Sequence, residues 1–173
     1  MNHLVANILA RRSTRSFEFK QIPDETVHEL LKAAMSAPSA GCEDPWQFMT
    51  VRTPGMLSRM AECLPHGSFL SQVGLAIVVC GEKEKAHGGD KGYMLLDCAA
   101  AMENILLAAT FLGLGSCWLG VHPRAEREAA IRSVLGIPSN ITPVGIAAIG
   151  YIKGQPHRAR TRYCDVLVHD EIW

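Results

Sequence analysis

Two short clusters of basic residues are the part of this sequence best suited to chemistry. The first, RRSTR, spans residues 11–15 and follows the apolar segment HLVANILA; the second, HRARTR, spans residues 157–162. Arginine presents five donors in a fixed planar fork that matches phosphate oxygens, and serine adds a hydroxyl donor. Two such clusters on a chain with no net charge predict a small anionic ligand, such as a phosphate. The alternative for either cluster alone is a solvated basic turn.

Two further segments are rich in residues that shape turns. APSAGCEDPW, residues 37–46, has Pro, Ser and Gly between a predicted helix and a predicted strand, which indicates a structured turn or a plain connection. GLGSCWLG, residues 113–120, has glycines that lack GxGxxG spacing and that follow a helix rather than a strand. We therefore expect a helix stop, then a strand whose backbone approaches something flat, which glycine permits.

The common catalytic arrangements are absent from the sequence. It contains no GxSxG, HExxH or CxxC motif, and Asp97 and Glu103, six positions apart, do not share a helix face. We find no evident acid–base pair, nucleophile or metal-binding set. An enzyme with such a sequence takes its reaction chemistry from a bound cofactor.

Hydrophobic periodicity predicts helices that alternate with strands around these segments. In residues 22–38 the apolar positions recur with helical spacing and Asp24 stands at the expected N-cap. Pro123 is expected at the start of the last helix and Gly136 at its end. The alternation predicts an α+β fold in which helices cover a small sheet. Helices are expected within residues 3–11, 22–38, 53–64, 90–113 and 123–136, the second of them ending before Pro38, and strands over 46–52, 74–81, 116–121 and 142–151.

Length and charge limit the class of protein. The chain is long enough for one domain over residues 1–173. Residues 152–173 form a tail that ends in Trp, and we expect it to reach across another surface, such as a partner subunit. With 17 acidic and 17 basic residues, the chain lacks the basic excess that binding to nucleic acid or an anionic membrane needs.

The long apolar stretch over residues 93–115 is expected to be a buried central helix rather than a membrane span. Asp97, Glu103 and Asn104 interrupt it. The six cysteines are scattered, and most lie in apolar runs where a thiol packs as a small hydrophobic group. Their distribution, together with the lack of a secretory signal, predicts a cytoplasmic protein.

Five segments, taken in order, resemble the FMN-dependent nitroreductase family over nearly the whole chain. ILARRSTRSF resembles its opening motif of two basic residues, Ser, any residue and a basic residue, and LLKAAMSAPSAGCEDPWQF resembles its Ala-Pro-Ser…Gln-Pro-Trp turn. LLDCAAAMENILLAATFLGLGSCWLG resembles its central helix and the following strand, and is the most specific piece. LGIPSNITPVGIAAIGY resembles its last strand, and RTRY and VHDEIW resemble its tail.

The resemblance implies an α+β fold with a small mixed β-sheet flanked by helices, in a domain-exchanged homodimer with FMN at the interface. The residues of the opening motif and the tail arginines would hold the phosphate, ribityl chain and pyrimidine edge. The turn residues would approach the same flavin from the other subunit, and the backbone after the central helix would lie against the ring. The cofactor-binding residues implied are Arg11, Arg12, Ser13, Arg15, Pro38, Ser39, Cys42, Leu119, Gly120, Arg160 and Arg162.

The activity implied by the resemblance is that of an NAD(P)H-dependent oxidoreductase. NADH or NADPH gives a hydride to flavin N5, and an acceptor such as a nitroaromatic or a quinone then takes the electrons, in a two-step ping-pong reaction. No catalytic side chain and no metal are implied, because the chemistry takes place at FMN. Two alternatives stay open: a specialised flavin enzyme with a different electron donor, and an FMN-binding redox sensor.

The sequence departs from the family pattern at three positions. Cys42 stands where the family turn usually has Asn, Asp44 where it has Gln, and Leu167 where the tail has a basic residue. A thiol is a weaker hydrogen-bond partner than an amide, and a carboxylate close to an electron-rich flavin repels it. The polar segment 82–93 is expected to be either a small lid over the ring or an exposed loop.

Overall fold

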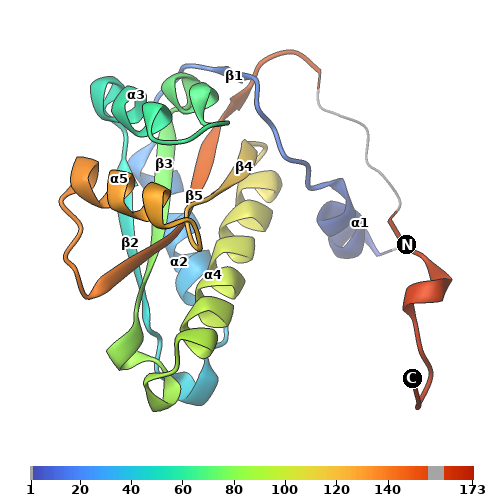
Figure 1. Cartoon of the computed structure of the whole chain (residues 1–173). Helices are drawn as coiled ribbons and strands as arrows, with labels where there is room; N and C mark the ends of the chain where they lie inside the picture. The colour runs from blue at the N-terminus through green and yellow to red at the C-terminus, as the bar shows by residue number, and fades with distance from the viewer. Residues whose placement is uncertain (1, 156–161) are drawn as a thin grey trace.

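A small sheet at the centre of the fold carries helices on both of its faces (Figure 1). The computed structural model describes residues 2–155 and 162–173. The α-helices are α1 (His3–Ala10), α2 (Asp24–Met35), α3 (Pro54–Glu62), α4 (Lys91–Phe111) and α5 (Ala125–Leu135). The strands are β1 (Phe17–Glu18), β2 (Trp46–Val51), β3 (Leu75–Glu82), β4 (Gly115–Gly120) and β5 (Ile141–Ile152). Short 3-10 turns are η1 (Ala40–Cys42), η2 (Ser68–Gln72), η3 (Lys83–Lys85), η4 (His87–Gly89) and η5 (Asp165–Leu167).

Strand β5 organises the sheet, because it pairs antiparallel with β1, β3 and β4. Strand β2 adds to the other side of β3, again antiparallel, which gives the order β1-β5-β3-β2 with β4 branching from β5. The parallel component of the predicted mixed sheet is a single isolated bridge between Ser13 and Ser116. The predicted α+β fold is confirmed.

The continuous apolar run of β3 is explained by the two faces of the sheet. Leu75, Ile77 and Val79 belong to the core cluster formed with α2 and α4. The intervening Ala76 and Val78 belong to the opposite cluster, formed with α3, α5 and η2. Since both faces are covered, neither set of alternate positions meets water, and the strand needs apolar side chains throughout.

Helix α4 is the central helix expected from the sequence. By length and composition alone it is apolar enough to cross a membrane, the one such helix among the described residues. In the fold it packs against α2 and the sheet, and Met94, Cys98 and Met102 are fully buried there. At its start the Asp90 side chain accepts a hydrogen bond from the Gly92 N–H at 2.5 Å. The expectation of a buried core helix opened by Asp90 is confirmed.

Two expected helix starts were wrong by one or two residues, and one strand was missed. Pro23, not Asp24, occupies the N-cap of α2, and the Asp24 carboxylate instead accepts a hydrogen bond from Arg52. Helix α5 begins at Ala125, two residues after Pro123, because Arg124 has an extended backbone. Strand β1 has only two residues, too few for a visible alternation, and exists because Phe17 and Glu18 pair with the end of β5.

Gly74 offers a test of how tightly the sheet is packed against the loop before α2. An added Cβ at Gly74 would lie 2.0 Å from the carbonyl oxygen of Lys20. We expect Gly74→Ala to lower the free energy of unfolding by about 3 kcal/mol, since backbone atoms must move apart. At Gly55, in α3, an added Cβ meets no atom within 4 Å. Gly55→Ala is therefore expected to raise the stability by about 1 kcal/mol through helix propensity. Urea titration measures the change in the free energy of unfolding for each variant, with opposite signs expected. Equal changes in the two variants would contradict the close contact at Gly74.

Candidate functional site: an arginine pocket beside strand β4

The segment after α1 places the first basic cluster beside β4. Helix α1 ends at Ala10, and Ser13 forms the parallel bridge with Ser116. The Thr14 N–H donates to the Ser116 carbonyl at 2.8 Å, and the Thr14 side chain is buried. Because successive side chains of an extended segment point to opposite sides, Ser13 and Arg15 face away from the core.

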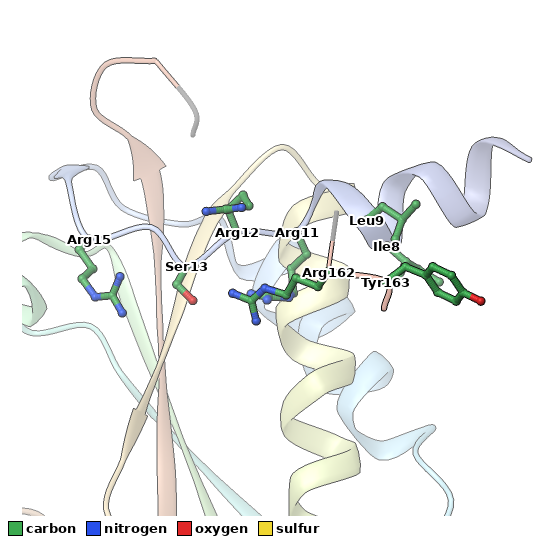
Figure 2. Close-up of a pocket in the computed structure, with 8 residues that line it drawn as sticks. All are labelled: Ile8, Leu9, Arg11, Arg12, Ser13, Arg15, Arg162 and Tyr163. Carbon is green, nitrogen blue, oxygen red and sulfur yellow. The ribbon is translucent and has the colours of Figure 1, made fainter. Parts of the chain in front are cut away.

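Ser13 and Arg15 line a cavity of about 370 Å³, which we call the arginine pocket (Figure 2). Its walls come from segments that are far apart in the sequence. Figure 2 shows Arg162, from the C-terminal tail, among side chains that come from α1 and the segment after it. The lining residues are Ile8, Leu9, Arg11, Arg12, Ser13, Arg15, Arg162 and Tyr163.

Positive charge in the arginine pocket is largely uncompensated. Arg11 has an acidic partner, Glu103 of α4, with 3.4 Å between Nε and Oε1. Within the described part of the chain, no ion pair involves Arg12, Arg15 or Arg162. Three unpaired guanidinium groups around one cavity favour an anion between them, and their planar donor sets match phosphate oxygens.

The thiol of Cys117 lies in β4 behind the basic segment. Burial raises the pKa of Cys117, and the nearby Arg15 and Arg11 guanidinium groups and a hydrogen bond with Ser13 only partly offset this rise. The thiol is therefore protonated at neutral pH and acts as a small buried packing group rather than a nucleophile. The same interactions show that the basic segment lies close against β4.

A second cavity of about 190 Å³, which we call the strand pocket, lies at the end of β4 and shares Arg15 with the arginine pocket. The structure thus brings Leu119 and Gly120 next to the basic cluster. The Leu119 side chain is buried, and a Cβ added to Gly120 would meet no atom within 4 Å. The backbone at Gly120 is therefore open to a ligand. The lining residues are Arg15, Leu64, Pro65, His66, Cys117, Trp118, Leu119, Gly120 and Arg127.

The turn residues Pro38, Ser39 and Cys42 line neither of these two pockets. The Ser39 hydroxyl donates a hydrogen bond to Asp44 Oδ1 at 2.5 Å. The backbone N–H of Ala40 donates to Oδ1 of the buried Asp97 at 3.1 Å. These bonds hold a turn in which Cys42 is exposed and has a left-handed backbone, with φ of 58°. Within one chain, the turn is a separate part of the surface.

The polar segment 82–93 lies beside this turn. It forms η3 and η4 and then the first turn of α4. A Cβ added to Gly41 would lie 2.7 Å from His87 Nδ1, so the imidazole lies directly over the turn. The His87 and Tyr93 rings meet edge to face, with 5.5 Å between their centroids. No residue of this segment lines the arginine pocket or the strand pocket.

Some expected site residues could not be placed, and others were missed. Arg160 lies outside the described residues. His66, Arg127 and Tyr163 line the two pockets, but the sequence analysis did not single them out. His66 and Arg127 are single polar residues outside any motif, so no local signal distinguishes them from solvent-exposed side chains. Tyr163 ends the RTRY segment, in which only the arginines are expected to bind the cofactor. Among residues 2–155 and 162–173, no three His, Cys, Asp or Glu side chains are grouped to hold a metal.

The fold and the two pockets define an α+β protein with an electropositive pocket beside β4, and comparison with known proteins identifies its family. The model of the nitroreductase family matches residues 8–64 and 60–151, and the chain belongs to this family. A protein of Archaeoglobus fulgidus, with the provisional name NADH dehydrogenase/NAD(P)H nitroreductase, is 44% identical over 100% of both chains.

Solved structures agree with this assignment. A Parabacteroides distasonis protein, also provisionally named NADH dehydrogenase/NAD(P)H nitroreductase, is 34% identical over 100% of both chains, with a TM-score of 0.93. A Clostridium difficile protein described as an FMN-dependent nitroreductase is 30% identical, with a TM-score of 0.89. That match covers 98% of this chain and 99% of the other.

Proposed function

We propose that this protein is a flavoprotein oxidoreductase. It transfers a hydride from NAD(P)H through bound FMN to an electron acceptor such as a nitroaromatic or a quinone, in a two-step ping-pong reaction. The observation that carries the proposal is that Arg12, Arg15 and Arg162 line one pocket without acidic partners among the described residues. Membership of the nitroreductase family, and the 30% identity to an FMN-dependent nitroreductase, support FMN as the anionic ligand.

In this proposal the arginine pocket holds the FMN phosphate. Arg11, Arg12 and Arg162 donate to the phosphate oxygens, and Ser13 donates to the ribityl chain or the phosphate. Each charge-assisted hydrogen bond contributes roughly 1.5–3 kcal/mol. Three or four such bonds account for tight retention of a cofactor that is not covalently attached.

Arg15 connects the phosphate site to the ring site, because it lines both pockets. The open backbone at Leu119 and Gly120 gives the flavin ring a flat surface, and a backbone N–H there stabilises negative charge on the ring. When bound, FMN supplies the redox chemistry, taking a hydride at N5 and passing the electrons on. The chain binds and orients the reactants, and no side chain is needed as a nucleophile.

The proposal includes a homodimer in which each subunit completes the other's site. Pro38, Ser39 and Cys42 then approach the flavin held by the second subunit, which accounts for their distance from the pockets of their own chain. The exposed apolar side chains on α1, α4 and the tail support such an interface. They include Val5, Ile8, Leu9, Leu96, Phe111, Val166, Leu167, Ile172 and Trp173.

We further propose that residues 1–173 form one FMN-binding domain whose tail, residues 152–173, reaches across the partner subunit. Figure 1 is compatible with this arrangement, since η5 lies at one side, away from the layers that cover the sheet. We place the enzyme in the cytoplasm, because all six cysteines are free thiols.

The visible absorption spectrum of the purified protein tests the proposed function. We expect a yellow protein whose flavin absorbance bleaches when NADH or NADPH is added without oxygen, and returns when a quinone is added. A bound flavin that neither nicotinamide reduces would contradict the proposed donor and favour a different donor or a redox sensor. A colourless protein that refuses added FMN would overturn the proposal.

A glycine in the strand pocket allows the ring position to be tested without disturbing the core. In Gly120→Val, the new side chain projects into the open space where the ring is proposed to lie. We expect an overpacking cost of about 1–3 kcal/mol in FMN binding, roughly a 5- to 150-fold weaker Kd. The unfolding temperature of the FMN-free protein should stay unchanged, and Gly120→Ala should have a smaller effect on FMN binding. Wild-type FMN affinity in Gly120→Val would place the ring elsewhere.

A further inference from the structure

Arg127 is the charged residue of the strand pocket that the site as proposed so far does not use. It lies in the first turn of α5, directly beyond the end of β4, and lines the pocket together with Arg15 and Gly120. It belongs to neither basic cluster of the sequence, and in the pattern AEREAAIR it is indistinguishable from an ordinary helix-surface charge.

The Arg127 guanidinium is fixed in place, yet one of its donors is unused. Its Nη1 donates to the carbonyl oxygen of Gly120 at 3.0 Å, which ties α5 to the last residue of β4. Its Nε is buried and has no hydrogen-bond partner among the described residues. A buried donor without a partner costs about 1–3 kcal/mol, so an acceptor from outside the chain would satisfy a donor the fold leaves unpaired.

The charge of Arg127 is not balanced by its surroundings. Glu128, its neighbour in α5, is committed to His122, with 2.6 Å between Oε1 and Nδ1. No carboxylate lines the strand pocket, and Arg15 adds a second guanidinium there. No ion pair formed by Arg127 occurs in the described part of the chain. The pocket is therefore electropositive on the side of α5 as well as on the side of the N-terminal segment.

We propose that Arg127 is a positioning residue that fixes the Gly120 peptide against the flavin ring and whose charge favours the reduced over the oxidised cofactor. The proposal rests on the proposed function, because it assumes that FMN lies in the strand pocket. A hydride brings two electrons and one proton to a neutral oxidised ring and leaves one negative charge on it. A fixed cation in a partly desolvated pocket stabilises that charge, and it has little effect on the neutral oxidised ring.

The test compares the midpoint potential of bound FMN in the holoenzyme, measured against a reference dye, with the Kd of oxidised FMN. In Arg127→Gln we expect the ratio of the affinities for reduced and oxidised FMN to fall about tenfold, equivalent to about 30 mV for a two-electron couple. Arg127→Lys keeps the charge and should restore most of the wild-type potential. Arg124→Gln is the matched control, because Arg124 is an exposed residue that lines neither pocket. The midpoint potential of FMN bound to Arg124→Gln should equal that of the wild type.

Several outcomes would overturn the inference. Arg127→Gln with the wild-type potential would leave Arg127 a purely structural link, and an equal shift in Arg124→Gln would show a general charge effect. If Arg127→Gln does not fold, Arg127→Met, which keeps an unbranched side chain and removes the charge, takes its place. Its midpoint potential should fall by the same amount, and a wild-type potential in Arg127→Met contradicts the proposal. A wild-type protein that does not bind FMN would remove the proposed function as well, whereas a normal flavin with an unshifted Arg127→Gln removes this inference alone.

Discussion

Replacing Arg162 with alanine is expected to weaken FMN binding about 10- to 150-fold, while the FMN-free protein unfolds at the same temperature as the wild type. Arg162 lines the arginine pocket and has no ion-pair partner among the described residues, so its removal breaks no ion pair within that part of the chain. The lost interaction is a charge-assisted hydrogen bond to phosphate, worth roughly 1.5–3 kcal/mol, and 1.4 kcal/mol corresponds to a factor of ten in Kd.

Arg11→Ala is expected to have a larger effect than Arg162→Ala. Arg11 is paired with Glu103 at 3.4 Å, so its loss removes a donor and also leaves a carboxylate unpaired beside the phosphate. Titration of the apoprotein with FMN, followed by quenching of flavin fluorescence, gives both constants. Arg59→Ala is a suitable control, because Arg59 lines a different cavity, beside β2 and α3. Unchanged FMN affinity in both Arg11→Ala and Arg162→Ala would mean that the phosphate lies elsewhere.

Ending the chain at Tyr163 is expected to abolish the dimer at micromolar concentration. This truncation keeps Arg162 but removes Val166, Leu167, Ile172 and Trp173, each of them more than three-quarters exposed in the single chain. Burying a large apolar side chain contributes about 1.5–3 kcal/mol, so four of them favour association by several kcal/mol even after the cost of ordering the tail. We expect the dimer Kd to rise at least about 1,000-fold, or about 4 kcal/mol.

Sedimentation of the truncated protein measures this change directly. Its FMN affinity should fall as well, although Arg162 is intact, because the separated subunits no longer supply Pro38, Ser39 and Cys42 to each other's flavin. Asp170→Asn in the full-length chain is the control for a polar change in the same exposed segment. A truncated protein that stays dimeric and yellow would show that the tail does not hold the subunits together.

Much of the fold could be predicted from local patterns. The β3 run is apolar from Leu75 to Gly81, which predicts a strand covered on both faces. Helix α4 is long and apolar, and the polar residues Asp97, Glu103 and Asn104 within it indicate a buried central helix rather than a membrane span. What could not be predicted depends on partners distant in sequence. Asp24 has the chemistry of an N-cap, but Arg52 competes for its carboxylate, and β1 exists only because β5 extends far enough to pair with it.

The residues of the candidate site also fall into those that a local sequence pattern could predict and those that only the fold brings together. The RRSTR cluster is a local signal, and the sequence is sufficient to propose a phosphate for it. That Arg162 lines the same pocket as Arg12 follows only from the course of the chain, since the spacing of the two clusters contains no information on their distance. Arg127 and His66 belong to no motif, and only the position of α5 and of the loop after α3 brings them to Gly120.

The way the basic segment is attached to the sheet also has a consequence for the order of folding. Thr14 is held by Ser116, and Phe17 by Ile152, so the anchors of the site join residues that are 102 and 135 positions apart in the sequence. Closing such long loops is entropically costly, and contacts of this kind form late and slowly compared with helices or hairpins. The core between them can assemble before these contacts exist. In a refolding experiment, secondary structure should therefore recover before the ability to capture flavin, which makes flavin capture a reporter of the last step of folding.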